Sequence, residues 1–145
     1  MIYCRIKLQE TNYKETNRCK VLWSSNHRAR LDTDKLLEIY NNYCKHKKFK
    51  SPWPYYKEQF TQEHFELLGY YNDDQLVAWS LIYIINEEVV EAFQFAWDYK
   101  NPELRLGILS LTNECAMYKK RGFKYILLGE ADDYKKEIKG FEIIK

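Results

Sequence analysis

Apolar residues recur along the chain with two different spacings, and each spacing predicts a different kind of element. After Thr33, a residue type that favours helix starts, apolar side chains at 36, 37, 39, 40, 43 and 44 repeat at helical spacing. Elsewhere, short apolar runs alternate with turn residues, as β-strands do. In chain order, the pattern predicts strands over 2–8 and 20–23, a helix over 33–48, a shorter helix over 55–68, strands over 70–97, a helix over 105–121, a strand over 124–128, a polar helix over 132–139 and a strand over 141–144.

The connections between these elements predict the sheet. Turn residues at 72–74 and 86–88 separate apolar runs, which is typical of an antiparallel meander. The strand that ends at Trp97 is followed by a helix and another strand, and such a crossover normally makes its two strands parallel neighbours. We therefore expect one domain over 1–145 of mixed α/β (α+β) class, with a mostly antiparallel central sheet flanked by helices.

The composition indicates the general class of protein but no specific function. The chain has 145 residues, enough for one core, and its 23 basic and 21 acidic residues leave a net charge of only +2. The four cysteines are widely separated, so neither a zinc site nor a disulfide framework is expected. The longest apolar run, near 76–85, is too short to span a bilayer, and no leader pattern is present. We therefore expect a soluble, cytoplasmic protein without a metal.

The junction between the strand ending at Trp97 and the next helix is the most informative segment. Its Asn101-Pro102 turn and single glycine, Gly107, lead into a helix whose first amide groups have no partner within the helix. Such amides bind an anion or a carbonyl oxygen, so the junction suits a phosphate or a transferred acyl group. Ser110, near the same helix start, either donates a hydrogen bond to a bound carbonyl or only serves the backbone.

Several motifs in this region resemble those of one family. They are Tyr99-Lys100-Asn101-Pro102, Arg105-Leu106-Gly107, Lys120-Arg121-Gly122-Phe123 and Tyr125-Ile126-Leu127-Leu128-Gly129, in matching order and spacing. The helix over 36–49 with its basic end, and the strand over 74–78, resemble further parts of the same family. The chain thus resembles the GNAT-like acyltransferases, and in particular the C-terminal domain of the arginyl- and leucyl-tRNA-protein transferases, over most of its length.

This resemblance implies an acyltransferase whose donor is an aminoacyl-tRNA or a related ester and whose acceptor is an amine. GNAT enzymes that use acetyl-CoA have a glycine-rich pyrophosphate loop at this junction, whereas 103–108 contains one glycine, which argues against acetyl-CoA. The residues expected to bind the donor are Arg105, Leu106, Gly107, Ile108 and Ser110. Two features depart from the family: Cys4 and Cys19 are isolated, so its cysteine-rich N-terminal segment is not matched, and 135–141 matches its closing motif only loosely.

Three side chains near the expected cleft are candidates for the chemistry. Asp98 follows an apolar strand and either orients or deprotonates an amine, or caps the turn through its own backbone amides. Glu130 stands just past the next strand, where it either acts with Asp98 on a cationic nucleophile or stabilises the following helix. Tyr99 either holds the acyl group through its hydroxyl or packs with a wet tip. Asp98, Tyr99 and Glu130 are therefore the predicted catalytic residues.

A basic segment with aromatic residues predicts contact with nucleic acid. It contains Lys45, Lys47, Lys48, Lys50, Trp53, Tyr55 and Tyr56. The lysines would neutralise phosphates, and the rings offer surfaces on which an unstacked base can lie, which suits tRNA or DNA. The alternative is a solvated helix end whose charges complement the helix dipole.

Two other functions stay open at this point. Phage DNA-modification proteins of the Mom type use the same compact GNAT-like scaffold to alter adenine, and here the target base would have to leave the stack. A catalytically inert GNAT-like binding module, such as an inhibitor of a host protein, would also account for the absent CoA loop and the weak catalytic constellation.

Overall fold

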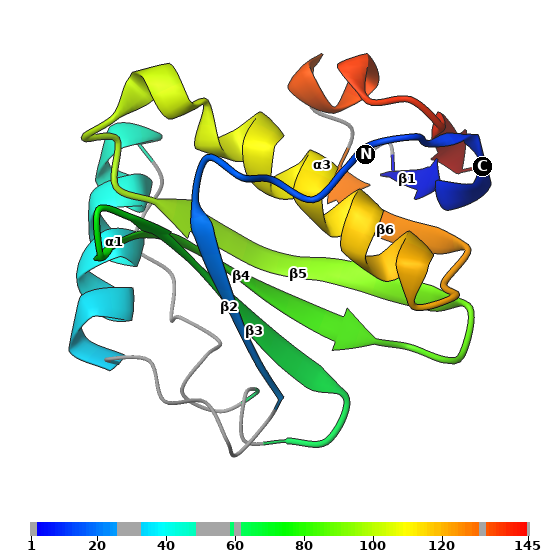
Figure 1. Cartoon of the computed structure of the whole chain (residues 1–145), viewed down its shortest axis with the longest axis horizontal. Helices are drawn as coiled ribbons and strands as arrows, with labels where there is room; N and C mark the ends of the chain where they lie inside the picture. The colour runs from blue at the N-terminus through cyan, green and yellow to red at the C-terminus, as the bar shows by residue number, and fades with distance from the viewer. Residues whose placement is uncertain (1–2, 26–32, 49–58, 60–61, 131–132, 145) are drawn as a thin grey trace.

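The computed structural model describes residues 3–25, 33–48, 59, 62–130 and 133–144. Their elements, with η for 3-10 helices, are β1 (Tyr3–Lys7), η1 (Leu8–Glu10), β2 (Lys20–Ser25), α1 (Thr33–His46), β3 (Phe65–Asn72), β4 (Gln75–Ile84), β5 (Val89–Trp97), η3 (Pro102–Leu104), α3 (Leu106–Lys120), β6 (Tyr125–Glu130), η4 (Asp133–Glu137) and β7 (Phe141–Ile144). Figure 1 shows β1, η4 and the C-terminus at one end of the molecule and α1 at the other. Apart from one segment discussed below, the predicted order of elements is confirmed.

Within the described ranges, the strands form one seven-stranded sheet in the order β2-β3-β4-β5-β6-β1-β7. Neighbouring strands are antiparallel except β5 and β6, which run parallel on either side of the α3 crossover. The register between these two covers only Val89–Glu91 and Tyr125–Leu127, so β5 continues to Trp97 without this partner. The predicted meander, the parallel crossover and the mixed, mostly antiparallel sheet are confirmed.

Each face of the sheet has its own hydrophobic core. One core packs α3 against residues such as Leu68 and Ala78, and the other packs α1 against residues such as Leu67 and Trp79. The indole of Trp79 donates to the carbonyl of Leu36, over 3.1 Å, which fixes α1 on its face. Because side chains alternate along a strand, the polar residues Glu66, Tyr70 and Ser80 share the face that α3 covers. Polar groups are therefore buried beneath α3, and their partners decide what they do.

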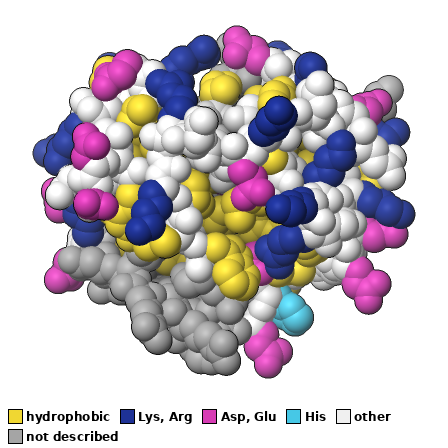
Figure 2. Space-filling view, in the orientation of Figure 1, with side chains coloured by type: hydrophobic (Ala, Val, Ile, Leu, Met, Phe, Trp, Pro, Cys, Tyr) yellow, Lys and Arg dark blue, Asp and Glu magenta, His cyan; other side chains and the backbone are white. Residues whose placement is uncertain are grey.

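The edge strand β2 carries large hydrophobic side chains on the surface. Leu22 is 43% exposed and Trp23 is 48% exposed. The guanidinium carbon of Arg121 lies 5.6 Å from the centroid of the Trp23 ring, so a cation from the end of α3 partly covers this ring. Figure 2 shows hydrophobic side chains gathered in the centre of one face of the molecule, with lysine and arginine side chains around them.

The predicted helix over 55–68 is wrong in its C-terminal part. β3 begins at Phe65, so residues 65–68 form a strand, and Gly69 lies inside this strand. His64 has a φ of 73°, a left-handed conformation that interrupts any helix before the strand. Residues 65–70 are all buried between β2 and β4, so the strand lacks the alternation that identifies a half-exposed strand. Residues 55–58 and 60–61 lie outside the described residues.

Candidate functional site

A cleft opens where β5 continues past its pairing with β6. Its inner cavity, of about 230 Å³, is lined by residues of β4, β5, α3, β6 and η4 and by Tyr43 of α1. An adjoining outer cavity of about 260 Å³ shares Tyr43, Phe95 and Gly107 with it and reaches the turn before α3. β5 also has a bulge, opposite Leu81 and Ile82 of β4. A bulge changes the direction of nearby side chains and is common beside functional sites. The junction singled out by the sequence thus forms one wall of a two-part cleft.

The start of α3 presents backbone to this cleft. Its N-cap residue, Arg105, has φ 48° and ψ 54°, and no side chain caps this helix start in the described structure. Tyr99 has a φ of 62°, so the connection from β5 to α3 holds two non-glycine residues in the left-handed region, at a cost of about 1 kcal/mol or more each. A Cβ added to Gly107 would meet nothing within 4 Å. The helix start therefore leaves open space beside amides that suit an anion or a developing oxyanion.

The inner cavity is also lined by Glu114, a residue that the sequence analysis missed. This side chain comes from the middle of α3 and is only 3% exposed. The hydroxyls of Tyr70 and Ser80 both donate to its Oε2, over 2.6 Å and 2.8 Å. Burial raises the pKa of the Glu114 carboxyl to about 7, against the lowering effect of these two hydrogen bonds. A carboxyl group that titrates near neutral pH inside a cleft is suited to proton transfer.

A spacing in the sequence would have identified this residue. Gly107, Ser110 and Glu114 are three and four positions apart, so they lie on one side of the helix. All three line the inner cavity. The sequence signal for Glu114 is that a serine and a glutamate share one side of the helix with this glycine. Polar residues seldom face a hydrophobic core unless they have a structural or functional role.

The five residues predicted to bind the donor divide into three groups. Gly107 and Ser110 line the inner cavity, although the Ser110 hydroxyl also donates to the carbonyl of Gly107 at 3.2 Å. Arg105, Gly107 and Ile108 line the outer cavity. Leu106 is fully buried and belongs to the hydrophobic core, so its side chain does not reach the cleft. The structure therefore brings four of these residues to the cleft, and their binding role stays a prediction.

Asp98 lies elsewhere, contrary to the expected position beside the split between the strands. It lines a different cavity, with Lys35, Asn101 and residues of the β3–β4 turn. Its Oδ1 accepts a hydrogen bond from the amide of Lys100 at 3.0 Å, which is the turn-capping alternative. The backbone continues past the strand end, where the amide of Asp98 donates to the carbonyl of Val77. Its predicted catalytic role gains no support from this position.

Tyr99 is held in a stack of rings at the end of α1. Its ring centroid lies 3.6 Å from that of His46 and 3.7 Å from that of Trp97, with Tyr43 at 6.0 Å. The hydroxyl oxygen is buried, and burial raises the pKa of this phenol. The stack ties α1 to the turn before α3, so Tyr99 packs beside the cleft, and its contact with an acyl group stays a prediction.

The remaining predicted site residues are only partly described. The backbone of Glu130 ends β6 and pairs with Tyr3, and its proposed partnership with Asp98 stays untested. Lys45 and Lys48 are exposed at the end of α1, and Lys47 lines the outer cavity. Lys50, Trp53, Tyr55 and Tyr56 lie outside the described residues. The basic end of α1 therefore borders the cleft, which is consistent with a nucleic-acid donor or with a solvated helix end.

In the ranges that the structure describes, no three His, Cys, Asp or Glu side chains are grouped so as to hold a metal ion. All four cysteines are buried, and burial raises the pKa of the Cys115 thiol to about 12, as an inert core cysteine requires. None of the described helices is long and apolar enough to cross a membrane.

A comparison with protein families gives one match. The model of the family described as "Arginine-tRNA-protein transferase, C terminus" matches residues 35–141, well over half of the chain. This match includes α1, the meander, the α3 crossover and the cleft between them. A search of curated proteins found no match.

Solved structures share the fold at low sequence identity. L-PGS from Bacillus licheniformis aligns with a TM-score of 0.62 at 11% identity, over 90% of this chain and 46% of its own. A GCN5-related N-acetyltransferase from Kribbella flavida aligns with a TM-score of 0.62 at 13% identity, over 97% of this chain and 53% of its own. A GNAT family acetyltransferase from Elizabethkingia anophelis with acetyl-CoA bound gives a TM-score of 0.54 at 14% identity, over 81% of this chain and 68% of its own. The fold is GNAT-like, and the chain spans about half the length of the first two proteins.

Proposed function

The chain belongs to the family of the arginine-tRNA-protein transferase C terminus, and we propose that it transfers an aminoacyl group from an aminoacyl-tRNA to an amine acceptor. Family membership and the GNAT-like fold support an acyltransferase-type function. The family description, which names a tRNA, supports the donor. The acceptor is proposed from chemistry, because an amine attacks an activated ester readily once the two are held together.

The observation that carries this proposal is the difference between the residues that line the outer cavity and those that line the inner cavity. The outer cavity is lined by two cations, Lys47 and Arg105, whereas the lining of the inner cavity combines the buried carboxyl group of Glu114 with one cation, Lys135, whose ammonium donates to the carbonyl of Leu128. Arg105 lies 4.0 Å from the carboxylate of Glu137, but these side chains are 68% and 65% exposed, so the pair is screened and a phosphate can compete for the guanidinium. Phosphates of a tRNA 3′ end therefore suit the outer part, and the esterified amino acid suits the inner part.

The helix start lies between these two parts. The amides at the beginning of α3 have no partner within the helix, and Gly107, where an added Cβ would meet nothing within 4 Å, lines both cavities. When an amine attacks the ester, negative charge develops on the carbonyl oxygen, and backbone amides that already point at this oxygen stabilise it without reorganisation. We propose that the ester carbonyl binds at Gly107 for this reason.

Two substitutions at Gly107 test the position of the donor. Gly107→Ala adds only a methyl group, whereas Gly107→Leu fills the shared part of the two cavities. Neither strains the backbone, and both residues favour a helix by up to about 1 kcal/mol over glycine, so both variants are expected to fold. We expect Gly107→Leu to lose at least ~10-fold in affinity for charged tRNA, a loss of about 1.4 kcal/mol. Binding by Gly107→Leu at the wild-type affinity would remove the donor from this cleft.

Filter binding separates this function from its alternatives. Charged tRNA, uncharged tRNA and duplex DNA are compared at two salt concentrations, because phosphate contacts weaken steeply with salt. The proposal expects preference for charged tRNA and transfer of a labelled amino acid to a peptide with a free amino terminus. Preference for duplex DNA would favour base modification, binding of acetyl-CoA in calorimetry would favour a CoA thioester donor, and no binding at all would favour an inert module.

A further inference from the structure

Glu114 is a titratable group that is buried at the inner part of the cleft. It lines the inner cavity together with Ser80, Ser110 and Gly107. The residue is 3% exposed, so its side chain is almost completely enclosed where it borders the cavity. Gly107 lies two helical turns before it on the same side of α3, at the proposed position of the ester carbonyl. The carboxyl group and the proposed carbonyl site therefore lie along one side of the helix and border the same cavity.

The hydrogen bonds of Glu114 leave part of the carboxyl group for another partner. The hydroxyls of Tyr70 and Ser80 both end on Oε2, and neither contact involves Oε1. Tyr70 is itself held by Asn113, whose Nδ2 donates to the Tyr70 oxygen at 3.4 Å. These contacts fix the orientation of the carboxyl group from β3, β4 and α3, which is the support that a reacting group requires.

The charged and titratable neighbours of Glu114 come from several elements. Tyr70 of β3, Cys115 and Tyr118 of α3, Tyr43 of α1 and Lys135 of η4 surround it or line the same cavity. The Lys135 ammonium donates to the carbonyl of Leu128 at 3.0 Å. The hydrogen bonds that Glu114 accepts thus come from neutral hydroxyls, so burial governs its titration, and its carboxyl group is available in both protonation states near neutral pH.

We propose that Glu114 is the proton acceptor of the transfer reaction, an inference that rests on the proposed function. The amine nitrogen attacks the ester carbonyl carbon, and Oε1 of the carboxylate takes the proton that this nitrogen loses. The new C–N bond forms, the C–O bond to the terminal ribose breaks, and the departing ribose oxygen takes a proton from the carboxyl group. Glu114 returns to its starting state, and no oxidant or further reactant is needed.

Asp98 is the less suitable candidate for this role. Its carboxylate lies in another cavity and already caps the turn at Lys100. A purely structural role for Glu114, as an anchor for Tyr70 and Ser80, is the main alternative. A third role is recognition of a positively charged aminoacyl side chain. These alternatives differ in whether Glu114 affects the pH dependence of transfer, its maximum rate or the affinity for the donor.

The test compares single-turnover transfer by the wild-type chain and by Glu114→Gln from pH 5.5 to 9. Glutamine keeps the shape and an oxygen that accepts hydrogen bonds, but it cannot take the proton. We expect the wild-type rate to rise with pH through an apparent pKa near 7, and Glu114→Gln to be about 10²- to 10⁴-fold slower, with that titration absent. The affinity of Glu114→Gln for charged tRNA should stay within about twofold of wild type, a difference below about 0.5 kcal/mol.

Two controls separate catalysis from folding. Glu88→Gln makes the same chemical change at an exposed position of the β4–β5 turn, away from the cleft, and should transfer at the wild-type rate. Glu114→Ala, with a truncated side chain, should regain part of its activity when formate is added, because a small carboxylate can replace the missing group. Rescue by formate is not expected if Glu114 only supports the packing of α3.

The outcomes distinguish this inference from the proposed function. A wild-type chain that transfers, with Glu114→Gln transferring equally fast or keeping the same pH profile, overturns the role of Glu114 and leaves the proposed function intact. Weaker binding of charged tRNA with an unchanged maximum rate also overturns it, in favour of substrate recognition. A wild-type chain that transfers nothing from charged tRNA overturns the proposed function and this inference together.

Discussion

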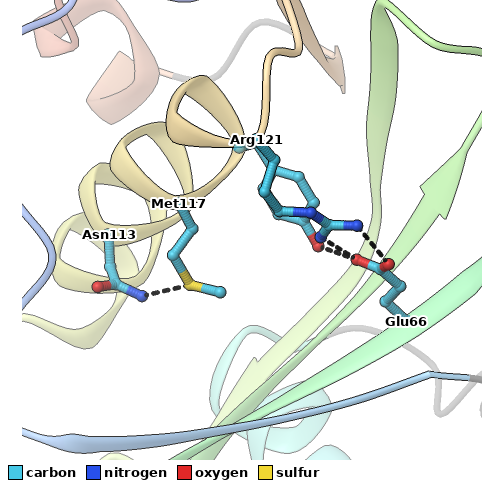
Figure 3. A network of polar contacts seen from close by, with 5 residues as sticks. Glu66, Asn113, Met117 and Arg121 are labelled. Carbon is cyan, nitrogen blue, oxygen red and sulfur yellow. Dashed lines mark hydrogen bonds and ion pairs between the residues drawn. The ribbon is translucent and has the colours of Figure 1, made fainter.

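Two glutamates, Glu66 of β3 and Glu114 of α3, lie between α3 and the sheet. They are almost equally exposed, but their carboxyl groups have pKa shifts in opposite directions. Glu66 is 4% exposed and Glu114 is 3% exposed, and each accepts a hydrogen bond from a buried tyrosine. Glu66 in addition binds the guanidinium of Arg121 through both carboxylate oxygens, over 2.7 Å and 2.9 Å (Figure 3). Among the residues that the structure describes, the hydrogen-bond donors to Glu114 are the neutral hydroxyls of Tyr70 and Ser80.

The partners determine the sign of each pKa shift. Burial alone would raise the pKa of Glu66, but hydrogen bonds from Arg121, Trp23 and Tyr118 outweigh it and lower the pKa. At Glu114, burial outweighs two hydroxyl donors and raises the pKa to about 7. Two side chains of similar surface exposure therefore behave differently: one is a fixed anion that joins α3 to β3, and the other is a more deeply buried carboxyl group that can change its protonation state in the cleft. The difference separates a structural glutamate from a candidate for chemistry.

The largest expected effect is the pH dependence of stability that Glu114 causes. Its pKa is raised on folding, so protonation stabilises the folded chain fully below the unfolded value of 4.5, and this contribution is lost as pH rises through about 7. The free energy of unfolding of Glu114→Gln lacks this loss. Between pH 4.5 and 7.5, we expect the free energy of unfolding of wild type to fall by about 3 kcal/mol relative to that of Glu114→Gln, as measured by urea titration. Parallel curves for the two proteins would show that burial does not control this carboxyl group.

Removing the cation from the other glutamate should have the next largest effect. Arg121→Met leaves a buried carboxylate with only neutral partners, and breaking a fully buried pair costs about 3–5 kcal/mol. Because the Arg121 side chain is 37% exposed, we expect a smaller loss of about 2 kcal/mol at pH 7.

The stability lost in Arg121→Met should depend on pH in the direction opposite to the stability contributed by Glu114. The pKa of Glu66 is lowered on folding, so its stabilisation is present above 4.5 and is lost as pH falls through the folded value. The difference between wild type and Arg121→Met should therefore shrink below pH 4.5, as measured by denaturant unfolding. An equal difference at pH 7 and pH 3.5 would mean that Arg121 acts through packing on Trp23 instead of through charge.

Tyr70→Phe weakens the support of Glu114 without removing the carboxyl group. The Tyr70 hydroxyl lowers the pKa of Glu114, so its loss should raise that pKa further. We expect a loss of about 1 kcal/mol in the free energy of unfolding at pH 6, where the carboxyl group is largely neutral, and somewhat more at pH 8. Urea unfolding at the two pH values measures the loss, and the pH profile of transfer should shift to higher pH. An unchanged profile would argue that Tyr70 does not influence the titrating group.

The fold was largely readable from the sequence because its elements agree with local pattern. The helical spacing after Thr33 and the strand-helix-strand crossover around α3 both follow from periodicity and turn residues. The segment 65–70 was misread because a central strand is buried on both faces and loses its alternation. Glu66 within it looks like the polar side of a helix, and its burial is explained by partners more than 50 residues away, Tyr118 and Arg121.

The site was readable only in part. Gly107 and Ser110 were found because a glycine at a helix start has a local signature, and both line the inner cavity. Asp98 was placed beside them from its position at a strand end, but which cavity a strand end faces depends on the turn that follows. Glu114 was missed because a glutamate within a helix normally faces water. Its burial depends on Ser80 and Tyr70, which come from two other strands.

The smallest effect on stability is expected from breaking an ion pair on the surface whose charged atoms are about as close as those of Arg121 and Glu66. The Lys124 ammonium lies 3.0 Å from Oε1 of Glu88, about as close as Arg121 is to Glu66, but the two side chains are 47% and 57% exposed. Lys124→Gln should change the free energy of unfolding by less than about 0.5 kcal/mol, because water screens the pair and holding two long side chains costs entropy. The backbone bonds of Lys124 to Glu88 and Leu8 do not depend on its side chain. Urea unfolding in low salt and in 1 M salt measures the change, and high salt should abolish it. A loss as large as that of Arg121→Met would show that distance between charges, and not burial of the carboxylate, sets the energy of these pairs.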